Sequence, residues 1–188
     1  MPTPDPATSG LAASPLRVVA LTALLLAAAA AQAATADDVQ SLLERGEHVA
    51  ALQLAQQAAD SNPRDARARF LQGVVLMDMG RDDEALAVFE QLAQLYPELP
   101  DPMNNIALLH ARGGRLDQAL SALQAALRND PGHRTARGNL GHVHLMLAVQ
   151  AWEQAAAAGP LDPALQRKLQ SARSLLAAPV PTAVAGPR

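Results

Sequence analysis

Three histidines are the residues in this sequence best suited to chemistry. His110 stands 34 residues before His144, and His142 lies two residues before His144. Imidazole nitrogens are common zinc ligands, so these residues suggest a small-ligand or metal-binding protein. Two residues so spaced on a helix point about 200° apart, which is poor geometry for one ion. We therefore expect His110 and His144 to be half-buried imidazoles and predict no metal, and we keep the ligand-binding protein as an alternative.

The acidic cluster Asp82, Asp83 and Glu84 resembles a catalytic carboxylate group. These residues come just before an apolar-periodic segment, where a helix should begin. Negative charge is favoured there because it caps free N–H groups and opposes the helix dipole. We expect Asp82 to cap that helix and predict no catalytic residue in the chain.

Composition narrows the possible functions further. The chain has 188 residues, of which 49% are hydrophobic and 18% charged, with a formal net charge of −3. Its basic residues are scattered among acids and its aromatic content is 2%, so neither a polyanion-binding patch nor a base-stacking platform is expected. The absence of cysteine excludes disulfides, thiolate zinc sites and thiol nucleophiles. We predict that the protein is not an enzyme, needs no cofactor and binds no nucleic acid.

The elements that would position any site recur along the chain with a constant period. Three residue types return every 34 residues: Gly46, Gly80 and Gly114; Ala51, Ala85 and Ala119; Pro63, Pro97 and Pro131. Between these markers, apolar residues follow the spacing of amphipathic helices. Asp65 and Asp101 are placed to cap first helices, and each glycine suits the turn between two helices. The pattern predicts repeated pairs of helices.

The details of the period resemble the tetratricopeptide repeat (TPR) family, whose 34-residue pattern combines small residues, an Ala-x3-Phe segment and a proline. The matching residues are Arg69-x2-Gln72-Gly73-x2-Leu76, Ala85-x3-Phe89 and Pro97 in one unit, and Met103-x2-Ile106-Ala107-x2-His110, Ala119-x3-Leu123 and Pro131 in the next. The resemblance implies an all-α fold, a short right-handed α-solenoid of three to four TPR helical hairpins plus a C-terminal capping helix. We assign the TPR domain to residues 34–176, with units at about 34–65, 66–99, 100–133 and 134–163.

The end of the array departs from the family pattern. Two residues are lost between Gly141 and Ala151, and no glycine or proline interrupts residues 145–152. Residues 136–158 therefore form either two helices with a tight turn or one long helix. After Asp162-Pro163, a cap followed by a first-turn proline, residues 163–176 are predicted to be the capping helix. Residues 177–188 are predicted to be a disordered tail.

The N-terminus has the features of an export signal. Arg17 precedes an apolar run that ends in Ala31-Gln32-Ala33, with small residues at the positions that a signal peptidase reads. We predict a signal peptide over residues 1–33, cleaved after Ala33. An uncleaved membrane anchor over residues 18–36 is the alternative, although alanine supplies little insertion energy. The protein is then exported, to the bacterial periplasm or cell envelope.

The family resemblance also implies a binding surface. First helices of successive TPR units line a concave groove that receives peptides or partner domains, so we predict a non-catalytic interaction scaffold or adaptor with a protein partner. The groove positions carried over from the family are Arg67, Phe70, Val74, Met77, Asp101, Asn104, Leu108, Ala111, Arg112 and His142. Asn104, Asn105 and Asn139 invite comparison with TPR domains that clamp a carboxylate, but the lysine of such clamps is missing before Lys168. A self-associating structural protein is a further alternative.

Overall fold

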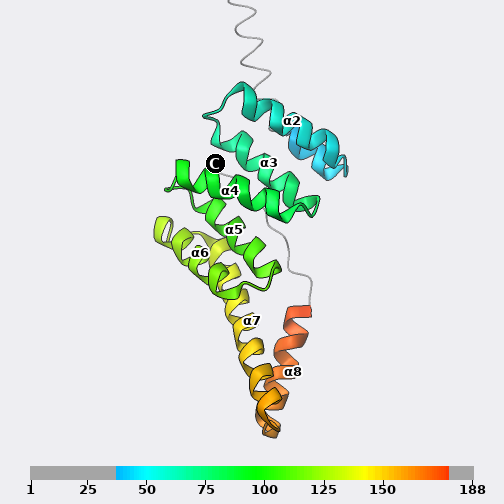
Figure 1. Cartoon of the computed structure of the whole chain (residues 1–188), viewed down its shortest axis with the longest axis vertical. Helices are drawn as coiled ribbons and strands as arrows, with labels where there is room; N and C mark the ends of the chain where they lie inside the picture. The colour runs from blue at the N-terminus through cyan, green and yellow to red at the C-terminus, as the bar shows by residue number, and fades with distance from the viewer. Residues whose placement is uncertain (1–36, 178–188) are drawn as a thin grey trace, which may run out of the picture.

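The structure is a computed structural model that describes residues 37–177, and every regular element in that range is an α-helix (Figure 1). A first helix covers residues 37–44. The helices that follow are α2 (His48–Ser61), α3 (Ala66–Asp78), α4 (Asp82–Leu95), α5 (Pro100–Arg112), α6 (Leu116–Asn129), α7 (Arg134–Ala158) and α8 (Pro163–Ala177). Each helix from α2 onward packs against the next one along the chain. The result is the all-α solenoid that the repeat pattern predicts.

The periodic glycines make the turns within the helix pairs. Gly46, Gly80 and Gly114 have φ angles of +73°, +70° and +70°, the left-handed region that residues with a Cβ rarely adopt. At the second turn, the Arg81 N–H donates to the Leu76 carbonyl over 2.9 Å, which satisfies an end carbonyl of α3. Glycine therefore recurs because the same backbone reversal is built three times.

Small residues are required where the two helices of a pair approach each other. A Cβ added at Gly73 on α3 would stand 2.7 Å from the Phe89 ring on α4, closer than real contacts allow. Phe89 is fully buried and lies beside Phe70, with 5.5 Å between the ring centroids and 58° between the planes. The Ala-x3-Phe segment thus supplies the centre of the main hydrophobic core.

Two of the predicted helix caps are confirmed and two are wrong. Asp65 accepts hydrogen bonds from the N–H groups of Arg67 and Ala68, and Asp162 accepts from those of Ala164 and Leu165. Asp82 lies inside α4, whose N-cap Arg81 makes no side-chain capping bond. Asp101 likewise lies inside its helix, because Pro100 already takes the first turn and Leu99 is the N-cap.

The last part of the solenoid resolves the alternatives that the sequence leaves open. Residues 134–158 form the single helix α7, 25 residues long, so no fourth hairpin turns back within it. Its N-terminal part packs against α6 and its C-terminal part against α8. A second, small core therefore lies between α7 and α8, built on Val149, Leu169 and Ala172.

Several sequence-based predictions fall outside the described residues. These are the signal peptide or anchor over residues 1–36 and the tail over residues 178–188, while Ala177 is the last residue of α8 rather than the first of the tail. Within residues 37–177, none of the helices has the length and apolar character needed to cross a membrane.

Candidate partner-binding site

The predicted groove positions lie on α3, α5 and the first half of α7, and half of them are buried. The buried ones are Phe70, Val74, Met77, Asp101 and Asn104. Phe70, Val74 and Met77 belong to the main core, where they pack with other apolar side chains. All five side chains have little exposed surface in this structure, and their contact with a partner stays a prediction.

The remaining groove positions reach the surface. Leu108, Ala111 and His142 are half-buried, and Arg67 and Arg112 are exposed. Arg112 donates to the Asp82 carboxylate over 3.2 Å and to the Met77 carbonyl over 3.4 Å, so it joins the end of α5 to the α3–α4 turn. Arg67 lies 3.7 Å from Asp37, both side chains being largely exposed. Arg67 is therefore held more loosely than Arg112 and is freer to meet a ligand.

Asp101 has a structural partner that the sequence did not reveal. His133, the N-cap of α7, accepts the Ala136 N–H at Nδ1 over 3.0 Å. Its Nε2 lies 3.0 Å from Asp101 Oδ1, and both side chains are nearly buried. Because Nδ1 accepts, the ring hydrogen is on Nε2 and is donated to Asp101. His133 stands two periods after Asp65, the cap of α3, and that register is the signal that could have identified it.

Three asparagines form a polar ladder between α7 and α5. Asn139 Nδ2 donates to Asn104 Oδ1 over 2.8 Å, and Asn104 Nδ2 donates to Asn105 Oδ1 over 3.3 Å. Asn104 and Asn105 are buried, whereas Asn139 is half-buried and forms the surface end of the ladder. Among the described residues, nothing pairs with the buried Nδ2 of Asn105. Buried amides are costly in a core, so this ladder is an unusual feature at the face that carries the groove positions.

The histidines do not converge on a metal site. His110 is half-buried as expected, and its Nδ1 accepts a hydrogen bond from Arg115 Nε over 3.0 Å. Burial and, secondarily, the charge of Arg115 hold the pKa of His110 below its usual value of 6.5. His144 is exposed on α7, contrary to expectation. Residues 37–177 contain no group of three or more His, Cys, Asp or Glu side chains that could hold a metal ion, so the geometry gives the ligand-binding alternative no support.

Comparison with known proteins identifies the repeat. The family model described as "Tetratricopeptide repeat" matches residues 37–100 and 104–163, about two thirds of the chain. A TPR repeat-containing thioredoxin, TTL4 of Arabidopsis thaliana, is 35% identical over 75 residues, which are 40% of this chain and 11% of that protein. This chain therefore spans only about a tenth of that relative's length.

Solved structures show the same fold. YrrB, described as a TPR protein with an unusual peptide-binding site, is 27% identical with a TM-score of 0.53, over 57% of this chain and 56% of that one. The first TPR of Spaghetti (RPAP3), bound to the HSP90 peptide SRMEEVD, is 12% identical with a TM-score of 0.57, over 62% and 93%. MamA of Desulfovibrio magneticus RS-1 is 18% identical with a TM-score of 0.54, over 77% and 76%. The helix pairs, the positive-φ glycines and the family match agree, and the chain belongs to the tetratricopeptide repeat family.

Proposed function

We propose that this protein is an exported, non-catalytic interaction module that binds an extended peptide segment of a partner on the face formed by α3, α5 and the first half of α7. TPR proteins serve as interaction scaffolds, and the RPAP3 and YrrB structures are described as peptide-bound and peptide-binding. The leader-like residues 1–33 support a place in the bacterial periplasm or cell envelope.

The asparagine ladder carries the proposal. Asn139 uses one amide hydrogen to bond Asn104, which holds the side chain in one orientation at the surface. Its second amide hydrogen and its carbonyl oxygen have no hydrogen-bond partner within residues 37–177. A side-chain amide oriented in this way can donate to a peptide carbonyl and accept from a peptide N–H at once. An extended peptide segment has free backbone N–H and carbonyl groups, so it can bond both the free amide hydrogen and the carbonyl oxygen of Asn139.

Side chains around the ladder supply the remaining recognition. Leu108 and Ala111 are half-buried on α5 and offer apolar surface, and the exposed Arg67 on α3 offers a guanidinium group. A partner segment with apolar side chains and a carboxylate group suits this combination.

Site-specific photo-crosslinking in intact cells tests the surface and the compartment together. A photoreactive amino acid replaces Ala111 or His142 on the first helices and, as controls, the exposed Gln94 on α4 or Gln124 on α6. We expect the first two positions to capture the same envelope protein and the controls to capture little of it. Crosslinks that come equally from the controls, or only from cytoplasmic proteins, contradict the proposal.

A second measurement separates the ladder from general stability. Asn139→Ala should weaken binding of the captured partner about 5- to 150-fold, because both of its hydrogen bonds to the peptide backbone are lost. Gln124→Ala, an exposed change on α6, should leave the affinity unchanged. Equal affinities of Asn139→Ala and the unmodified protein, with both folded by circular dichroism, would remove the ladder from the binding site.

A further inference from the structure

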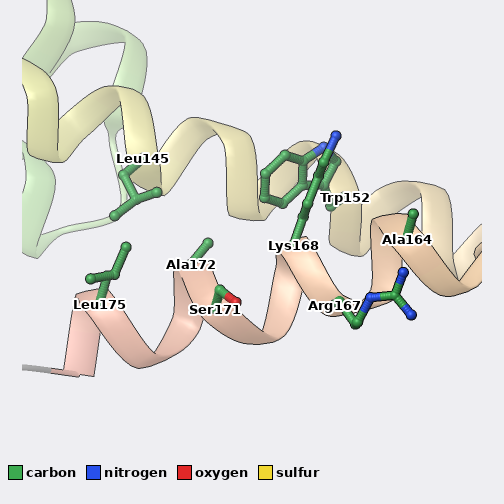
Figure 2. Close-up of a pocket in the computed structure, with 8 residues that line it drawn as sticks. All are labelled: Leu145, Trp152, Ala164, Arg167, Lys168, Ser171, Ala172 and Leu175. Carbon is green, nitrogen blue, oxygen red and sulfur yellow. The ribbon is translucent and has the colours of Figure 1, made fainter.

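A pocket of about 460 Å³ lies between α7 and α8, and none of its lining residues is one of the predicted groove positions. Figure 2 shows Leu145 and Trp152 on α7 and Leu175 on α8 among its lining residues. The exposed fraction of Leu175 is 65%, among the highest of the large hydrophobic residues in the described chain. In a longer array, the next helix pair would cover this face, and within residues 37–177 no further helix covers this terminal pocket.

The rim of the terminal pocket is basic. Arg167 and Lys168 line it and are exposed, and neither forms an ion pair with another residue of the described chain. The third basic residue of α8, Arg173, is already paired with Glu153 on α7 at 2.7 Å. The helix α8 contains no acidic residue, so this end of the molecule carries uncompensated positive charge.

The first hairpin lies at the opposite end of the solenoid from α8 (Figure 1), and its composition is complementary to the terminal pocket. The first hairpin, residues 37–61, contains five acidic residues and one arginine. Asp38 and Glu44 are exposed and form no ion pair within the described chain. Val49, at the start of α2, has an exposed fraction of 64% and supplies an apolar side chain in the same hairpin.

We propose that a second copy of this chain docks its first hairpin on the terminal pocket, so that molecules associate head to tail. The acids of the first hairpin face Arg167 and Lys168, and Val49 covers apolar surface beside Trp152 and Leu175. This contact joins two different surfaces, so it is heterologous and can propagate from one molecule to the next. The head-to-tail contact involves neither the asparagine ladder nor the groove positions. A result that contradicts the proposed peptide binding therefore does not contradict this contact.

Sedimentation of the protein purified from cells expressing the full chain tests the proposal. The average mass should rise with protein concentration at an ionic strength of about 0.1 M, where charges act over about 10 Å. At about 1 M this range falls to about 3 Å, so the mass should return toward that of the monomer. Trp152 is the only tryptophan in the chain, so its emission should change together with the mass.

Charge reversal identifies the two surfaces. One variant carries Arg167→Glu and Lys168→Glu, and the other carries Asp38→Lys and Glu44→Lys. Each variant alone should stay monomeric because its pocket and its hairpin are then no longer opposite in charge. A mixture of the two should associate again, because the unchanged acidic hairpin of the first variant matches the unchanged basic pocket of the second. Arg64→Glu with Arg128→Glu is the control, because these exposed residues lie on neither surface and the change in net charge equals that of the first variant.

The outcomes distinguish this contact from other association. Loss of self-association in both variants, its recovery in the mixture and wild-type behaviour of the control support the proposal. A monomer at every concentration overturns it, as does association that both variants retain. A mixture that stays monomeric while each variant is folded by circular dichroism also overturns it, because complementary charges would then not be what joins the ends.

Discussion

His110 and His133 have different roles at the scale of single residues, although both accept a hydrogen bond at Nδ1. His133 accepts from the backbone of α7 and donates to Asp101, so it joins two repeats. His110 accepts from Arg115 in the turn that follows its own helix. At His110 the accepted hydrogen bond requires an Nδ1 without a proton, so protonation of that ring would break the bond from Arg115.

The first prediction concerns His110 and pH. Because the pKa of His110 in the folded protein lies below 6.5, the unfolded chain takes up the proton first as the pH falls. The stabilising contribution of the neutral ring is therefore fully present above pH 6.5, the ordinary pKa of histidine. It is lost as the pH falls from there toward the lower pKa of His110 in the folded protein. Urea unfolding at pH about 7.5 and about 5 should show a smaller loss of stability for His110→Gln than for the wild type.

Arg115→Gln provides the matched comparison. It removes the secondary cause of the low pKa, the nearby positive charge, and leaves the burial of the ring in place. Its pH dependence should lie between those of the wild type and His110→Gln. If all three proteins lose the same free energy of unfolding on acidification, the ring of His110 does not contribute to acid sensitivity.

At the scale of elements, the glycines inside α3 and α7 differ in whether packing leaves room for a side chain. Gly73 is the place where α3 meets the Phe89 ring of α4, and an added methyl group would overlap that ring. Gly141 on α7 has no atom within 4 Å of an added Cβ. One glycine is therefore required by packing, and the other only costs helix stability.

Alanine substitution should separate these two cases. Gly73→Ala should lower the free energy of unfolding by about 1–3 kcal/mol, because the fully buried Phe89 ring has to move. Gly141→Ala should raise it by up to about 1 kcal/mol through helix propensity. Chemical denaturation of the two variants checks both signs, and a destabilised Gly141→Ala would show that α7 needs a break at that point.

At the scale of the whole molecule, the solenoid has two cores of unequal size. The main core runs from the first helix to the first half of α7, and the second lies between α7 and α8. Only Leu169 and Ala172 are buried on α8, compared with seven residues on α5. Repeat proteins are stabilised by contacts between neighbours, so the end with fewer contacts should open first.

Hydrogen exchange measures this difference directly. At a protein concentration where the mass is that of a monomer, amides of α8 should exchange at a lower opening free energy than those of α5. Leu169→Ala removes a buried side chain and should speed exchange in α8 while leaving α5 unchanged. Equal acceleration in both helices would mean that the array unfolds as one cooperative unit.

The sequence by itself determined the helix pairs and their turns. Periodic apolar residues, recurring glycines and prolines act locally or between neighbouring repeats, so a single chain displays them as a 34-residue period. The positions of Gly46, Gly80 and Gly114, the caps Asp65 and Asp162 and the small residue at Gly73 follow from that period. The candidate groove on first helices was inferred from the family resemblance, and it stays a prediction.

Only the tertiary structure decided which of those groove side chains are available. Phe70, Val74 and Met77 have the spacing of either a core or a binding face, and their burial depends on how neighbouring helices pack against α3. The bond from His133 to Asp101 and the asparagine ladder likewise depend on contacts between segments about 30 residues apart, and the structure also shows that residues 134–158 form one helix. Local preferences define a helix and its ends, but the side chains that meet across two helices are set by the three-dimensional packing of the whole array.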